Sequence, residues 1–226
     1  MKIKFGALVV AGRGKVGGHV ASRNRSGAYL RTKVTPVNPG TTYQTDARNR
    51  LGGLSSTWKG LTAAQRLAWN AAVVDYATTD IFGDLRNPSG FILHQKLNNN
   101  LLNIGKAAIT VPPLSTAVVP LLTMSFAAIN GGAATLTYTA PIEADQSLIV
   151  FATPALSPGK SFVKSEYRQI AVMVAADVTP YVITTEYEAK FGAIGASGQK
   201  IFIKAYNIHW DSGQAGIPLS AVAVIS

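Results

Sequence analysis

The spacing of apolar residues changes along this chain from the period of a helix to the period of a strand. Between residues 41 and 106 apolar residues recur every three or four positions, as on one face of a helix. Beyond residue 120 apolar and polar residues alternate, as in Leu136–Thr139, which is the period of a half-buried strand. A single type of secondary structure cannot have both periods. We therefore expect an α+β protein in two parts, joined by a proline-containing linker over residues 107–120.

The first predicted helix lies between residues 41 and 60. Its apolar residues follow one another at spacings of four, four, three and four: Tyr43, Ala47, Leu51, Leu54 and Trp58. Thr41 or Thr42 can cap the start, and Gly60 can end the helix. Gly52 and Gly53 weaken it by roughly 1 kcal/mol each relative to alanine, and we expect them to permit close approach of another backbone.

Two further helices complete a small helical domain over residues 41–106. Thr62–Gln65 has the pattern of a capping box and opens the second helix. The apolar stripe of this helix is Trp69, Ala72, Val73 and Tyr76. The third helix is predicted from Ser89 to about Asn103, with Gly105 as its stop. Its expected inward residues are Phe91, His94, Leu97, Leu101 and Leu102.

Residues 1–40 are rich in glycine, arginine and lysine and form the predicted basic arm. Ala7–Ala11 and Ala28–Val34 have the composition of short strands, with glycine turns expected at Gly14–Gly18 and Asn24–Gly27. A β-hairpin or an extended arm fits this pattern. The apolar stretch that follows Lys2 and Lys4 is short and is followed directly by further basic residues, so we expect no secretion signal.

Seven short strands are predicted over residues 121–226, separated by turn signals. They are Leu121–Ile129, Ala133–Ala140, Ser147–Thr153, Tyr167–Ala175, Tyr181–Tyr187, Lys200–Ile208 and Leu219–Ile225. This number and spacing predict an all-β, immunoglobulin-like sandwich. Ala134–Pro141 resembles the second strand of fibronectin type III domains, and Lys200–Gly213 resembles their sixth strand and the following loop. The sequence departs from that family in lacking a tryptophan in the third strand and a tyrosine at the tyrosine corner.

The basic charge of the chain is concentrated at its N-terminal end. The formal net charge is +10, and residues 1–60 hold eleven basic side chains against a single acid, Asp46. Such asymmetry is typical of a protein that contacts an anionic partner, although a solubilising basic face is the simpler alternative. The expected contact residues of the arm are Arg13, Lys15, Arg23, Arg25, Tyr29, Arg31 and Lys33.

Catalytic, metal and cofactor sites are not predicted. The chain has no cysteine, and His19, His94 and His209 are too scattered to share a metal ion. The Gly12–Gly17 stretch matches a dinucleotide fingerprint, but no helix or acidic residue follows at the required spacing, so we interpret its glycines as turn formers. Asp80 and Asp84 bracket a predicted turn. We therefore expect a protein that is not an enzyme, binds no cofactor and does not enter a membrane.

Three stretches of the N-terminal half carry a resemblance to a known group of proteins. Residues 14–39, 54–70 and 87–103 resemble a poorly characterised family of virion-associated proteins in tailed phages and prophages. The strongest part is Trp58, Leu61-Thr62, Gln65-Arg66 and Ala68-Trp69, and the likeness covers residues 12–110. The resemblance implies a virion location, after synthesis in the host cytoplasm, and it implies no catalytic residue.

Together these observations predict a structural protein of a tailed-bacteriophage virion. Within that class we expect a capsid cement or decoration protein, which binds the major capsid protein lattice in many copies through the basic arm. A tail or head–tail component is one alternative. The other is a nucleic-acid-binding protein without sequence specificity, in which the basic residues contact phosphates.

Overall fold

The computed structural model describes the whole chain except residues 5, 7–10, 36 and 140–141. Helices and antiparallel sheets are both present, so the fold is mixed α+β and mostly β. The chain divides into two compact units. The N-terminal unit contains Met1–Asn49 and Ala77–Arg86, and the second unit contains Arg50–Tyr76 and Asn87–Ser226. This division differs from the predicted domain limits at residues 40 and 106, because residues 77–86 belong with the N-terminal segment.

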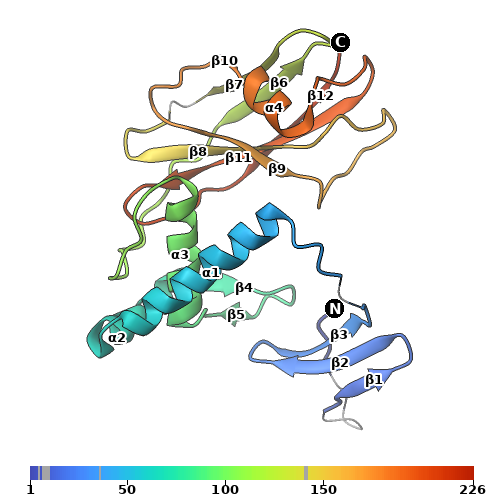
Figure 1. The fold of residues 1–226 in the computed structure, drawn as a ribbon. Coiled ribbons are helices and arrows are strands. Elements are labelled where there is room, and N and C mark those ends of the chain that lie inside the picture. The colour runs from blue at the N-terminus through green and yellow to red at the C-terminus, as the bar shows by residue number, and fades with distance from the viewer. Residues whose placement is uncertain (5, 7–10, 36, 140–141) are drawn as a thin grey trace. The chain divides into compact units, whose positions relative to one another are not determined.

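The N-terminal unit is built on an antiparallel sheet with the strand order β1-β2-β3 (Figure 1). The strands are β1 (Gly14–Val16), β2 (His19–Asn24) and β3 (Gly27–Thr32). Met1–Ile3 lies along the other edge of β3, where Lys2 pairs with Tyr29. A second hairpin consists of β4 (Thr78–Thr79) and β5 (Leu85–Arg86).

The predicted arm is therefore a meander of three strands, and its prediction needs correction. The predicted strand Ala7–Ala11 falls almost wholly outside the described residues. Strand β1 lies in the stretch predicted as a turn, Gly14–Gly18, and β2 lies in a stretch for which no strand was predicted. The turns themselves are tighter than expected, with two residues each, at Gly17-Gly18 and Arg25-Ser26. Glycine and arginine are frequent in this stretch, so the alternation of apolar and polar residues that indicates a strand is not evident in the sequence.

Helix α1 (Thr42–Gly60) has the predicted limits, and the hydroxyl of Thr41 accepts a hydrogen bond from the backbone N–H of Gln44 at 3.4 Å. The predicted apolar face is only partly buried. Leu54 is buried, whereas Tyr43 is 68% exposed and Leu51 is 47% exposed. The expected close approach at Gly52 and Gly53 was wrong, because no other segment of the described chain lies within 4 Å of the place where a Cβ atom of either glycine would stand.

Three short helical elements pack around Trp69 in the second unit. They are α2 (Ala63–Ala71), the 3-10 helix η1 (Ala72–Tyr76) and α3 (Gly90–Asn103). The capping box of Thr62 and Gln65 is confirmed, with both reciprocal hydrogen bonds present. Ser89 caps α3 as predicted. Trp69 is fully buried with Leu61, Leu93 and Leu97. The predicted helical stripes thus contribute to a core, except that Leu102, expected inward, is 37% exposed and Leu93, not predicted, is fully buried.

His94 lies inside this core, in contact with two tryptophan rings. Its ring centroid is 5.4 Å from that of Trp58 and 5.2 Å from that of Trp69. It is fully buried, and neither ring nitrogen has a hydrogen-bond partner among the described residues. Burial lowers the pKa of His94 below its usual 6.5, because a charged imidazole would lose its hydration. The side chain therefore acts as a neutral packing group.

Residues 107–120 contain no helix or strand, but both ends of the segment are fastened to the second unit. Near the start of the segment, the side-chain amide of Asn98 donates a hydrogen bond to the backbone carbonyl of Ile109. It also accepts a hydrogen bond from the backbone N–H of Ile109. Near its end, the amide of Asn207 donates to the carbonyl of Val119 at 2.8 Å. The predicted linker is thus a packed connection within one compact unit.

Two antiparallel sheets follow, with strand orders β10-β7-β6 and β12-β11-β8-β9 (Figure 1). The strands are β6 (Thr123–Ala128), β7 (Ala134–Thr139), β8 (Gln146–Ala152), β9 (Arg168–Met173), β10 (Tyr181–Val182), β11 (Lys200–His209) and β12 (Leu219–Val224). Apolar residues from both sheets, such as Leu136, Val150 and Ile203, are fully buried in one common core. The strand predictions are confirmed within two residues at each end, except over Tyr181–Tyr187.

That exception makes the all-β prediction wrong. The chain leaves β10 after Val182 and forms helix α4 (Thr184–Phe191). Ile183 and Tyr187 are fully buried while Thr185 between them is exposed, which is the pattern of a helix, because a strand would place all three side chains on one face. The hydroxyl of Tyr187 donates to the carbonyl of Thr153 at 3.1 Å and so fixes the helix against the sheet that contains β8.

A glycine at the start of α3 tests how tightly the helices pack. A Cβ atom on Gly90 would lie 2.4 Å from Oδ1 and 2.9 Å from the backbone N of Asn70. We expect Gly90→Ala to lower the free energy of unfolding by about 1–3 kcal/mol, measured by urea denaturation with tryptophan fluorescence. Gly53→Ala is the control, because no neighbouring atom lies within 4 Å and the helix should gain about 1 kcal/mol. Equal effects of the two substitutions would contradict this packing.

The neutral state of His94 predicts an acid-sensitive helical core. Its pKa is lower in the folded chain than the 6.5 of the unfolded chain, so the unfolded state binds a proton first as the pH falls. Stability should therefore be complete at about pH 7 and decline toward about pH 5. His94→Leu should flatten this decline in urea denaturation followed at several pH values. An unchanged pH dependence in the variant would assign the effect to another group.

Candidate anion-binding surface of the N-terminal unit

The structure separates the charge of the chain between its two compact units. The N-terminal unit holds ten basic and three acidic side chains, a formal net charge of +7. The second unit is almost three times as long, and it holds eleven basic and eight acidic side chains. The excess charge thus belongs to one small folded body, and that body is the natural place to look for an anionic partner.

Asp80 organises the hairpin loop of this unit. Its Oδ1 atom accepts hydrogen bonds from the backbone N–H of Phe82 at 2.8 Å and of Asp84 at 3.2 Å. Its own N–H donates to the carbonyl of Asp84 at 2.9 Å, and Gly83 supplies the positive φ of 83° that the turn needs. The carboxylate therefore accepts the hydrogen bonds that two backbone N–H groups would otherwise make to water. In this way it fixes the shape of the loop between β4 and β5.

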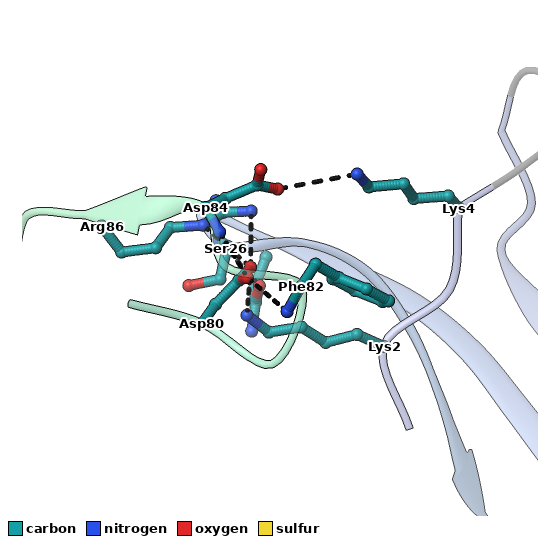
Figure 2. A network of polar contacts seen from close by, with 8 residues as sticks. Lys2, Lys4, Ser26, Asp80, Phe82, Asp84 and Arg86 are labelled. Atoms are coloured by element: carbon teal, nitrogen blue, oxygen red, sulfur yellow. Dashed lines mark hydrogen bonds and ion pairs between the residues drawn. The ribbon is translucent and has the colours of Figure 1, made fainter. Parts of the chain in front are cut away.

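The second oxygen of the same carboxylate joins two cations from distant parts of the chain (Figure 2). Oδ2 of Asp80 lies 3.0 Å from Nζ of Lys2 and 3.3 Å from the guanidinium of Arg86. Only 4% of the Asp80 side chain is exposed. The hydrogen bond from Lys2 and the two backbone bonds hold the pKa of Asp80 at about 2, below its usual 3.8. Asp80 thus stays ionised and neutralises part of the positive charge of Lys2 and Arg86.

Lys4 makes weaker contacts with the same loop. Its Nζ lies 3.6 Å from Oδ2 of Asp84 and 5.1 Å from the centre of the Phe82 ring (Figure 2). Half of the Asp84 side chain and most of the Lys4 side chain are exposed, so water screens this ion pair. Lys4 is therefore held loosely and can turn toward a bound anion at small cost.

A hollow of about 780 Å³ lies beside this network, within the N-terminal unit. Five basic residues line it: Lys2, Lys4, Arg13, Arg23 and Arg86. The remaining wall comes from small or apolar residues, among them Ile3, Ala28 and Phe82. Arg13 and Arg23 form no ion pair with any described residue. The hollow thus combines a ligand-sized volume with cations whose charge is not balanced inside the described chain.

The structure distributes the seven predicted contact residues over this unit without gathering them at one point. Arg13 and Arg23 border the hollow. Lys15 and Arg31 share one sheet face with Tyr29, as the pairing of β1, β2 and β3 requires. Arg25 lies in the turn between β2 and β3, and Lys33 follows β3. All six basic side chains are exposed, and none forms an ion pair within the described residues.

Sequence reasoning missed part of this surface. Lys2, Lys4 and Arg86 were not among the predicted contact residues, and Asp80 was noted only for its turn. The turn itself is signalled locally by Asp80, Gly83 and Asp84. The pairing with Lys2 spans 78 positions, and no local pattern indicates it.

Other candidate groups do not form a second site. The Gly12–Gly17 stretch is followed by strand β2, and thus lacks the helix that would hold a pyrophosphate. His209 has a side chain that is only 16% exposed and lies 3.1 Å from Asp145. Glu186 lies in α4 and accepts a hydrogen bond from Tyr181. No group of three metal-binding side chains occurs among the residues described.

The described helices also bear on membrane insertion. None of them combines the length and the apolar character needed to cross a bilayer. The exposed basic residues of the N-terminal unit offer attraction and hydrogen bonding to anions, by lysine as a point charge and by arginine as a planar fork.

Removal of the Asp80 charge tests the role of this carboxylate. Asp80→Asn keeps the size of the side chain but leaves Lys2 and Arg86 without a partner, so hydrogen exchange across residues 77–86 should accelerate. In the native chain the same segment should lose protection as the pH falls from about 4 toward 2, since a lowered carboxyl pKa gives stability that is lost on protonation. Asp46→Asn, an exposed acid on α1 without an ion pair among the described residues, is the control. Equal exchange in both variants would contradict the role assigned to Asp80.

No family model, no curated protein and no solved structure matches this chain.

Proposed function

We propose that this chain is a non-catalytic structural protein of a tailed-bacteriophage virion. Within the virion it acts as a capsid cement or decoration protein, and the basic N-terminal unit binds the major capsid protein lattice. The observation that carries this proposal is the concentration of a +7 charge in one small folded unit, with six exposed and unpaired basic side chains. The resemblance of residues 12–110 to virion-associated phage proteins supplies the setting.

Attachment through such a unit follows from simple electrostatics. Exposed cations on a rigid sheet attract an acidic surface at long range and can then form charge-assisted hydrogen bonds with carboxylates. Each contact is individually weak in salt. In a symmetric shell many copies act together, so weak contacts per copy suffice for a stable decoration.

The β part of the second unit supports the same role. We propose that residues 121–226 form an immunoglobulin-like sandwich of the fibronectin type III kind. Its first, second and fifth strands (β6, β7 and β10) share one sheet, and its third, fourth, sixth and seventh strands share the other. Helix α4, next to the short fifth strand, is a departure from that pattern. Such a nearly neutral body is suited to projecting from a shell or contacting its neighbours, by analogy of fold.

Two other assignments remain testable alternatives. A tail or head–tail component would use the same basic surface at lower copy number. A nucleic-acid-binding protein would direct the same cations to phosphates, and its affinity would fall steeply with salt. Tyr29, the aromatic residue among the predicted contact residues, is half-buried and is thus poorly placed for base stacking.

Virion composition tests this proposal. Mass spectrometry of purified virions should detect the protein in hundreds of copies, the number a capsid lattice requires. Recombinant protein should bind isolated capsids and raise their disassembly temperature. A charge-reduced variant, Arg25→Gln with Arg31→Gln and Lys33→Gln, should bind more weakly, whereas Lys59→Gln with Arg66→Gln should bind like the native chain.

Two results would contradict the assignment. Absence of the protein from virions would remove the structural role altogether. Six or twelve copies per virion would instead place it in the tail or at the head–tail junction.

A further inference from the structure

The hollow of the N-terminal unit has the features of a specific site within the broader basic surface. Its cations fall into two groups. Lys2 and Arg86 are engaged by Asp80, at 3.0 and 3.3 Å, and thus have a structural role. Arg13 and Arg23 border the same hollow, and neither has an acidic partner among the described residues.

Because only some of the basic residues in the hollow are paired with an acid, the hollow keeps a net positive charge that attracts anions. Asp80 is already shared between two cations and two backbone N–H groups, so it has little capacity to neutralise a third charge. Lys4 is bound only loosely to Asp84 and lies next to the hollow. An entering anion would therefore meet three basic side chains that are free or nearly free, on a wall whose position Asp80 fixes.

The shape of the site favours a protein segment over nucleic acid. About 780 Å³ accommodates a few amino-acid side chains, whereas a duplex presents a wide convex surface that cannot enter such a space. Ile3 and Ala28 add apolar wall beside the cations, which suits the methylene groups of aspartate and glutamate.

We propose that this hollow binds an acidic peptide segment of a partner protein, with Arg13 and Arg23 as the residues that bind its carboxylates. The choice of a protein partner rests on the proposed attachment function. Guanidinium groups are suited to this task because two parallel N–H donors match the two oxygens of a carboxylate. The remaining basic residues, among them Arg25 and Arg31, contribute general attraction from outside the site.

Fluorescence anisotropy with a labelled oligoglutamate peptide tests the proposal on the full chain. The native protein should bind the peptide saturably and should not bind an oligoglutamine peptide of equal length. Arg13→Gln with Arg23→Gln should weaken binding by about tenfold or more, because two charge-assisted contacts are lost. Arg25→Gln with Arg31→Gln removes the same charge from the same unit and should weaken binding less than about threefold. Circular dichroism checks that both variants stay folded.

Three outcomes would overturn the proposal. Equal weakening by the two double variants would mean diffuse attraction without a site. Absence of peptide binding would exclude the ligand class. Tighter binding of a labelled oligonucleotide, lost in the Arg13 and Arg23 variant, would assign the hollow to phosphate. None of these results removes the protein from the virion, and absence from the virion would leave peptide binding intact, so the two proposals fail separately.

Discussion

A single carboxylate determines how the N-terminal unit is assembled and how its charge is used. Asp80 closes its own loop through two backbone N–H groups and binds Lys2 and Arg86 with its other oxygen. A nearly buried charge with several donors is well satisfied, and its low pKa reflects this. The cations that it binds are committed to structure. The exposed cations that lack such a partner are the ones available to another molecule.

The two compact units divide the tasks of the protein accordingly. The second unit owes its order to apolar packing, around Trp69 in the helices and around residues such as Leu136 and Ile203 between the sheets. Several of its buried polar side chains are hydrogen-bonded to distant backbone groups of the same unit, as Asn98 is to Ile109 and Asn207 is to Val119. The N-terminal unit buries far less and depends more on hydrogen bonds and ion pairs. A well-packed unit of low net charge together with a strongly basic, polar unit fits a protein that attaches through one of its units.

Local signals predicted much of this fold, and long-range contacts account for most of what was missed. The capping box of Thr62 and Gln65 and the cap at Ser89 act within three residues, so the sequence reveals them. Residues 183–191 are rich in strand-forming types, yet the segment is helical, with Ile183 and Tyr187 in the core and Thr185 exposed. For the site, the basic residues were visible in the composition. Their division into paired and unpaired cations was not, because it depends on Asp80 meeting Lys2 from 78 positions away.

Cross-linking within assembled virions tests most directly whether the N-terminal unit is the attachment element. A zero-length carbodiimide joins lysine amines to carboxylates that they touch, and peptide mapping identifies the pairs. We predict that Lys15 and Lys33 of the N-terminal unit join to aspartate or glutamate residues of the major capsid protein. Lys96 and Lys164 of the second unit, which are also exposed, serve as internal controls and should give few such links. Capsid links confined to second-unit lysines would contradict the account.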